Sequence, residues 1–245
     1  MKELTTMAVM LLFIASTVQA QEKENDGENE VETTIAADIV SQYVWRGQDL
    51  GNASIQPTLG IAWKGLSFTA WGSVGLANAD DTKELDLTLE YTVGGLNVGI
   101  TDYWTNQGAD PKNRYFKYDS HGTNHVFEAN VGYDFGPVAL QWYTNFAGND
   151  GVNKKEKRAY SSYMELTVPF RLATVEWEAA AGVVPFETDY YGTTGFAVTN
   201  VSLKATKEVT LSDKFSFPIF AQFAANPCDR KAYLAFGLTL QPWGD

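Results

Sequence analysis

Cysteine is almost absent from this 245-residue chain, which contains Cys228 alone. A disulfide framework is therefore excluded. Histidine is nearly as scarce, with two residues, and 18 basic residues are outnumbered by 30 acidic ones, for a formal net charge of -12. A chain of that sign repels phosphate, so no nucleic-acid partner is expected.

Long apolar runs are missing too. Hydrophobic residues make up 44% of the chain and aromatic residues 13%. After residue 20, however, no stretch approaches the roughly 20 consecutive apolar residues that a transmembrane helix needs. If the mature protein resides in a membrane, it must cross with strands.

The N-terminal segment has the pattern of an export signal. Lys2 precedes an apolar stretch at 7–15, and Val18-Gln19-Ala20 supplies the small residues of a cleavage site before Gln21. We expect residues 1–20 to be a cleaved signal peptide; the alternative is an N-terminal anchor helix, for which the apolar stretch is short. Residues 21–32 are mostly acids and amides with little to bury, which predicts a flexible acidic tail.

Strict alternation of apolar and polar residues dominates the remainder. Residues 84–93 are the clearest case, because Leu85, Leu87, Leu89, Tyr91 and Val93 share one face and the residues between them are polar. Such a period of two is typical of a strand with different media on its two faces. The pattern recurs and predicts twelve strands, at 33–46, 53–64, 66–76, 84–93, 96–104, 124–135, 138–146, 158–170, 172–184, 195–206, 215–226 and 230–240.

The connections between these strands alternate in length. Tight turns are expected at 64–65, 94–95, 136–137 and 171, with a longer connection at 207–214 on the same side. Longer loops are expected on the other side, including 105–123, 147–157 and 185–194. An even strand count with alternating short and long connections is typical of an outer-membrane barrel. Residues 33–245 are therefore predicted to form a transmembrane antiparallel up-and-down β-barrel, located in the cell outer membrane.

Aromatic residues near the expected strand ends agree with this prediction. They could form the rings that lie at headgroup level in membrane barrels. The residues concerned are Tyr43, Trp45, Trp63, Tyr103, Trp104, Trp142, Phe170, Phe215 and Phe217.

Several short segments resemble the TorF-type porins of Gram-negative bacteria. They are Asp38-Ile-Val-Ser-Gln-Tyr-Val-Trp-Arg-Gly47, Ser54-Ile-Gln56, Trp71-Gly-Ser73, Glu84-Leu-Asp86 and Gly94-Gly-Leu-Asn-Val-Gly99. The resemblance runs from about residue 33 to the end and is densest before residue 105. It implies an outer-membrane barrel that acts as a pore, with Arg46 and Gly47 as matched motif positions, and it implies no catalytic residue or agreed solute.

Few residues suggest other chemistry. His121 and His125 lie in or beside the longest loop, near Asp119 and Ser120, so a rim hydrolase with a serine and a histidine is an alternative, although no G-x-S-x-G elbow occurs. Asp49, Asp80 and Asp81 lack the spacing of a calcium loop, and two histidines without a cysteine partner make no zinc signature. Cys228 is expected in a short external loop as an incidental thiol. We expect no cofactor or metal, and no enzymatic activity.

The polar strand face is the better candidate for function. Its members predicted to line a pore are Asp38, Gln42, Arg46, Glu84, Asp86, Glu90, Glu128, Glu165, Glu176, Glu178 and Lys204. The acidic excess favours cations or neutral polar solutes. Alternatively, these groups cross-link one another in a filled interior, because twelve strands lie between packed barrels of about eight and open porins of about sixteen.

The sequence therefore predicts a monomeric, narrow, acid-lined pore for small solutes, with the membrane lipid and those solutes as partners. Two other functions stay open: a structural or adhesive barrel that conducts nothing, and an outer-membrane hydrolase.

Overall fold

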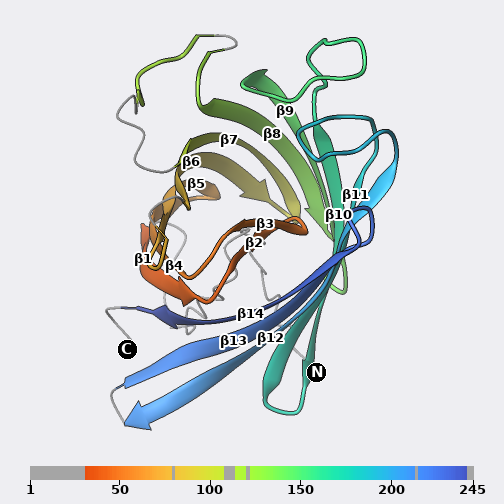
Figure 1. The fold of residues 1–245 in the computed structure, drawn as a ribbon. Helices are drawn as coiled ribbons and strands as arrows, with labels where there is room; N and C mark the ends of the chain where they lie inside the picture. Colours follow the sequence, from red (N-terminus) through yellow and green to blue (C-terminus); the bar gives the residue numbers. More distant parts are fainter. Residues whose placement is uncertain (1–30, 79–80, 108–113, 120–121, 213–214, 242–245) are drawn as a thin grey trace.

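The computed structural model describes residues 31–78, 81–107, 114–119, 122–212 and 215–241. Twelve antiparallel strands form one closed barrel, as predicted (Figure 1). Their bounds are β1 Glu32–Val40, β4 Ser54–Trp63, β5 Leu66–Gly75, β6 Thr82–Val93, β7 Leu96–Gln107, β8 His125–Asp134, β9 Ala139–Gly148, β10 Ser162–Leu172, β11 Val175–Val184, β12 Ala197–Ser212, β13 Phe215–Asn226 and β14 Lys231–Leu240. Because β1 pairs with both β4 and β14, the barrel has no free sheet edge.

Two differences from the predicted strands matter. The first strand was expected to run to Arg46, but it ends at Val40, and β2 (Tyr43–Trp45) pairs with β3 (Gln48–Gly51) in a separate hairpin. This hairpin lies within the ring of barrel strands in Figure 1. The longer connection predicted at 207–214 is wrong as well, because 207–212 continue β12 and pair with β13.

The two ends of the barrel differ as expected. At one end the connections are tight, at 64–65, 94–95, 135–138 and 173–174, so the turn predicted at Arg171 lies two residues later. At the other end they are longer, including 41–53, 108–124, 149–161 and 185–196. Gly95 shows how a tight turn is specified: with Gly94 it forms a two-residue hairpin loop in which both residues have positive φ, of 55° and 88°. We call these the short-turn end and the long-loop end.

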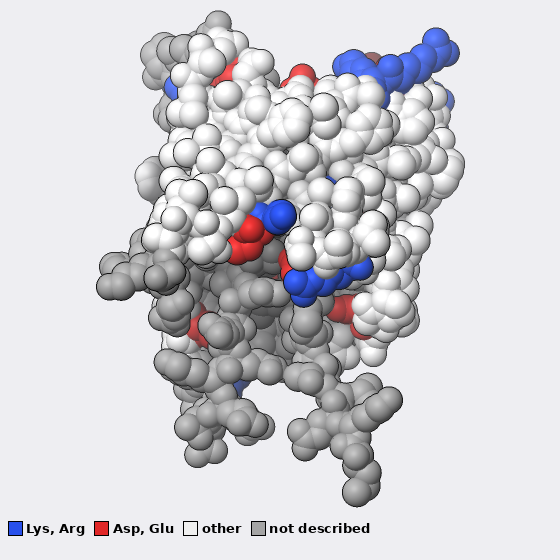
Figure 2. Space-filling view, turned by 90° about the horizontal axis from the view of Figure 1, so that it is seen from below, with Lys and Arg blue, Asp and Glu red and all other residues white. Residues whose placement is uncertain are grey.

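The two faces of the wall have opposite character. On the outward face, large apolar side chains are exposed, among them Leu59, Phe68, Leu89, Ile100 and Phe223. A space-filling view shows a broad area of wall without charged side chains (Figure 2). On the inward face the buried residues are mostly polar, and they include Asp38, Gln56, Glu84 and Asn145. The protein is therefore apolar outside and polar inside, the reverse of a water-soluble fold.

Helices contribute nothing to the described part of the chain. No helix there is long and apolar enough to cross a membrane. The predicted signal peptide at 1–20 and most of the predicted tail at 21–32 lie outside the described residues.

Candidate functional site

The β2–β3 hairpin carries Arg46 at its tip. Arg46 and Gly47 form the turn with positive φ values of 48° and 76°. A side chain at Gly47 would meet the backbone carbonyl oxygen of Thr199 on β12, so glycine permits the close approach. The Asn226 side-chain amide donates to the Gly47 carbonyl at 3.2 Å. The tip is therefore fixed against β12 and β13.

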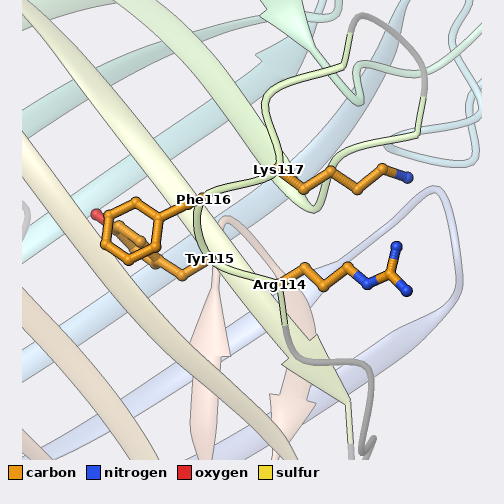
Figure 3. Close-up of a pocket in the computed structure, with 4 residues that line it drawn as sticks. All are labelled: Arg114, Tyr115, Phe116 and Lys117. Atoms are coloured by element: carbon orange, nitrogen blue, oxygen red, sulfur yellow. The ribbon is translucent and has the colours of Figure 1, made fainter.

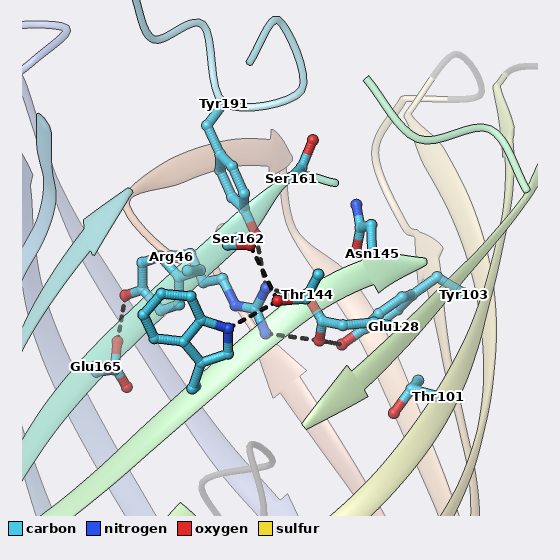
Figure 4. Close-up of polar contacts among 12 residues, drawn as sticks. Arg46, Thr101, Tyr103, Glu128, Thr144, Asn145, Ser161, Ser162, Glu165 and Tyr191 are labelled. Atoms are coloured by element: carbon cyan, nitrogen blue, oxygen red, sulfur yellow. Dashed lines mark hydrogen bonds and ion pairs between the residues drawn. The ribbon is translucent and has the colours of Figure 1, made fainter. Parts of the chain in front are cut away.

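The Arg46 guanidinium forms an ion pair with Glu128 on β8. Nη1 donates to Oε2 at 2.6 Å and Nη2 donates to Oε1 at 2.9 Å, a bidentate geometry. Nη1 also donates to the Tyr191 hydroxyl at 2.6 Å, from the loop between β11 and β12. Figure 4 shows these three groups converging. Since the partners lie 82 and 145 residues from Arg46, the hairpin ties distant parts of the wall together.

Aromatic rings surround the same guanidinium. Its central carbon lies 4.3 Å from the ring centroid of Trp45, 4.1 Å from that of Tyr143 and 4.7 Å from that of Tyr163. Such contacts stabilise a cation by about 0.5–2 kcal/mol each. Arg46 is 4% exposed, Glu128 2% and Tyr163 0%. The lumen is therefore packed with side chains at the level of Arg46.

Tyrosine hydroxyls are the recurring partners of the buried glutamates. Tyr103 donates to Glu128 at 2.8 Å and Tyr43 donates to Glu84 at 2.9 Å. Tyr163 donates to Glu165, which also accepts from the Asn200 amide at 3.2 Å. Each of these carboxylates thus accepts a hydrogen bond from a neutral donor, which offsets part of the free-energy cost of burying it.

Tyr191 contributes from outside the barrel strands. Burial raises the pKa of its phenol above the ordinary value, against the opposing effect of the Arg46 charge. The phenol therefore stays neutral around pH 7 and can accept from Arg46. Its ring lies 6.2 Å from Trp45 and 5.9 Å from Tyr163, stacked on both. The loop that carries Tyr191 thereby packs on the hairpin.

A second charged group lies on the inward face at β1, β11 and β12. Asp38 accepts from the Thr239 hydroxyl at 2.6 Å. Lys204 is directly opposite Glu178 in the β11–β12 register, and its ammonium lies 4.1 Å from the centroid of the Phe220 ring. Asp38 and Lys204 are both buried. Lys204 interacts electrostatically with both Asp38 and Glu178.

The remaining residues that were predicted to line the pore differ in how deeply they are buried. Asp86 is buried near Glu84, whereas Glu90, Glu176 and Glu178 are half-buried. Glu90 and Glu176 lie near the short-turn end of their strands, where the inward face is more accessible. Gln42 was predicted on a barrel strand, but it lies in the bend between β1 and β2 because the first strand ends early.

Three aromatics predicted at headgroup level are elsewhere. Tyr43, Trp45 and Tyr103 lie inside the barrel, where Tyr43 and Tyr103 donate to glutamates and the Trp45 ring contacts Tyr103 at 5.9 Å between centroids. By contrast Trp63 and Phe215 are exposed beside the short-turn end. Tyr43 and Trp45 were misplaced because the first strand ends at Val40. Tyr103 was misplaced because a tyrosine counts as apolar in an alternation pattern although its hydroxyl suits a polar interior.

Sequence reasoning also missed Tyr143, Tyr163, Tyr191 and Asn200. A signal existed for two of them: Tyr143 lies two residues from Gln141 and Asn145, and Tyr163 lies two residues from Glu165, so each shares a strand face with polar residues. For Tyr191, which is in a loop, the sequence offered no such signal.

His125 lies on the outward side of β8, and both of its ring nitrogens have acceptor partners. Nδ1 is 2.7 Å from Asp102 Oδ1, and Nε2 is 2.5 Å from the Tyr115 carbonyl oxygen. Neither nitrogen faces a hydroxyl, as a serine hydrolase would require. His121 and Ser120 lie outside the described residues, and Asp119 pairs with Lys117 at 3.5 Å.

The other singled-out residues are in ordinary settings. Among the described residues, no group of three or more His, Cys, Asp or Glu side chains could hold a metal ion. Asp81 accepts from the amides of Asn52 and Asn78, and Asp49 accepts from the Gly51 backbone. Asp80 lies outside the described residues. Cys228 is exposed in the turn between β13 and β14, the predicted position.

Comparison with known proteins adds little. No protein-family model matches the chain, and no curated protein matches its sequence. Among solved structures, the barrel is similar to the crystal structure of an outer membrane channel from Pseudomonas putida F1, with 14% sequence identity and a TM-score of 0.39. The match covers 89% of this chain and 98% of that one. A likeness this distant carries no argument about function, so function is argued from the geometry above.

Proposed function

We propose that this protein is an outer-membrane barrel that passes small solutes through a narrow, acid-lined lumen constricted by the β2–β3 hairpin. The observation that carries the proposal is the folding of the hairpin into a closed barrel that is apolar outside and polar inside. In lipid every backbone polar group must find a partner within the protein, and a closed barrel achieves this. The signal-peptide pattern and the resemblance to TorF-type porins agree with this location.

The charges of the inward face support a preference for cations or neutral polar solutes. Arg46 is engaged by Glu128, and Lys204 lies opposite Glu178. Glu90 and Glu176 are half-buried near the short-turn end. Carboxylates in a low-dielectric tube attract cations from a distance. We propose that these residues line the path, and that the barrel acts as a monomer.

The packing around Arg46 favours a second function, that of a structural or adhesive barrel that conducts nothing. Side chains fill the lumen there, as the near-complete burial of Arg46 and Tyr163 shows. If solutes pass, the hairpin has to move. We therefore propose that the hairpin is a gate, held shut by the Arg46–Glu128 pair. A permanently fixed hairpin would make the barrel a closed scaffold instead.

Removal of the hairpin distinguishes a gated pore from a closed scaffold. Val40 of β1 pairs directly with Ser54 of β4, so a two-residue Asn-Gly turn can replace residues 41–53 without changing the register. We expect liposomes that contain the intact protein to take up small sugars slowly, and liposomes that contain the shortened protein to take them up much faster. Uptake by neither protein, with both correctly folded by their heat-modifiable migration, would contradict a pore.

A further inference from the structure

The external connection between β7 and β8 folds onto the outside of the barrel. Tyr103 of β7 points inward to Glu128, so the alternating Asp102 and Trp104 point outward. The ring of Tyr115, from the connection, lies 5.4 Å from that of Trp104 and 5.1 Å from that of His125. Residues 114–118 therefore cover the outward face near the long-loop end.

Hydrogen bonds hold this segment in place. His125, which is 0% exposed, joins the Tyr115 carbonyl to Asp102 through its two ring nitrogens. The Thr123 hydroxyl donates to the Lys117 carbonyl at 2.5 Å, and the Tyr118 ring stacks on His125 with 4.4 Å between centroids. The side chains that the segment presents outward are thus held on a fixed backbone.

Those side chains are sorted by chemistry. Figure 3 shows Arg114 and Lys117 extended side by side in one direction, with Tyr115 and Phe116 on the opposite side. Phe116 is 87% exposed although its ring packs on Tyr115 at 5.1 Å, so it projects from the wall. Asp119, 70% exposed, is the charged neighbour of Lys117 at 3.5 Å, an exposed pair that another anion can displace.

From this arrangement we infer that Arg114, Tyr115, Phe116 and Lys117 form a binding surface for a lipid with a phosphorylated headgroup. Phe116 enters the apolar layer, and the two cations bind the phosphate, Arg114 by its planar guanidinium and Lys117 as a point charge. An aromatic residue beside basic residues is the composition that lies at a membrane interface. On a chain with a net charge of -12, a local pair of cations is needed to hold an anionic lipid.

The inference rests on the proposed location of the barrel in the outer membrane, because it places this surface against lipid. It is independent of conduction. A barrel that binds the lipid but passes no solute would contradict the pore and leave this surface intact. A barrel that conducts without a preference for phosphorylated lipid would do the opposite.

The test is native mass spectrometry of the purified full-length protein in neutral detergent, titrated with bis-phosphorylated lipid A and with its dephosphorylated form. We expect the wild-type protein to prefer the phosphorylated lipid, and the R114Q/K117Q variant to bind it at least about tenfold more weakly. The matched control is K155Q/K157Q, which removes the same charge from exposed lysines of another external loop. This control should bind like the wild-type protein.

Two further measurements identify what is recognised. F116S should weaken lipid binding while the barrel stays folded by heat-modifiable migration. Inorganic phosphate at the same concentration should not compete. Equal lipid affinity in R114Q/K117Q and wild type, or an equal loss in the control variant, would overturn the inference. Full competition by inorganic phosphate would overturn it too, since the surface would then recognise a free anion and not a lipid.

Discussion

Replacement of Glu128 by glutamine is expected to release the β2–β3 hairpin from the lumen. The variant keeps the size of the side chain but loses the carboxylate that accepts two bonds from Arg46, at 2.6 and 2.9 Å. Arg46 then remains buried without its counter-charge. Loss of one partner of a buried ion pair costs about 3–5 kcal/mol. The hairpin can avoid this cost by moving into water, where the guanidinium is hydrated.

The size of the effect follows from the same figure. About 3–5 kcal/mol corresponds to a shift of roughly two to three and a half decades in the ratio of released to inserted hairpin, at 1.4 kcal/mol per decade. The contacts of Arg46 with Tyr191 and the surrounding rings are present before and after the change, so they do not alter this difference. The ratio of open to closed gate should therefore be larger in E128Q than in the wild-type protein by about two to three and a half decades.

The assay is single-channel recording in a planar bilayer, with open probability as the readout. E165Q is the matched control, because Glu165 is also buried but forms its hydrogen bonds with Tyr163 and Asn200 and none with Arg46. A double variant, R46M/E128M, should be less destabilised than either single methionine variant, since no charge is left unpaired. If E128Q and E165Q both record like the wild-type protein, the ion pair does not hold a gate.

Three further changes test other parts of the structure. Replacement of Glu84, Asp86 and Glu90 together by their amides should lower the cation-over-anion permeability ratio, most clearly at low salt, because the Debye length is about 10 Å at 0.1 M; an unchanged reversal potential would contradict a role of these charges. G47A should lower the unfolding temperature and raise solute uptake. The reason is that positive φ costs alanine about 1–2 kcal/mol and that the new Cβ meets the β12 backbone. An unchanged unfolding temperature and unchanged uptake would mean that the hairpin tip is not fixed against β12. H125A should speed trypsin cleavage of the loop after β7 by about 10–100-fold. The variant loses hydrogen bonds that involve a charged group, which contribute about 1.5–3 kcal/mol. Cleavage at the same rate in H125A and in the wild-type protein would show that the histidine does not hold the loop.

The barrel itself could be predicted from the sequence because its signal is local. In 84–93 each apolar residue faces outward and each polar one inward, and the observed β6 covers that range. The alternation of short and long connections then follows from the positions of the strands. Both features are consequences of the period of two along a strand, which needs no knowledge of distant residues.

The hairpin was missed because the same period continues past the true end of β1. Tyr43 and Trp45 keep the alternation of Ile35, Ala37 and Ile39, so the pattern extends the strand to Arg46. What ends the strand is tertiary: the tip is stabilised by Glu128 and Tyr191, far along the chain. A local pattern contains no information about such contacts.

The candidate site, too, could be predicted only in part. The sequence placed Arg46, Glu128 and Glu165 on one polar face, but it could not pair Arg46 with Glu128 or identify the tyrosines that accompany the glutamates. The half-buried Glu90 and the buried Glu84 look alike in the sequence, because both occupy the same face of one strand. Their difference in depth comes from the hairpin, whose Tyr43 binds Glu84.

The most direct measurement of the central claim is the reversal potential of the wild-type barrel in a planar bilayer across a tenfold gradient of KCl. A narrow lumen lined by carboxylates predicts a conductance with a potential of the sign for potassium selectivity, which shrinks as the mean salt concentration rises. No conductance from correctly folded protein, or a potential of the sign for chloride selectivity, would contradict the account.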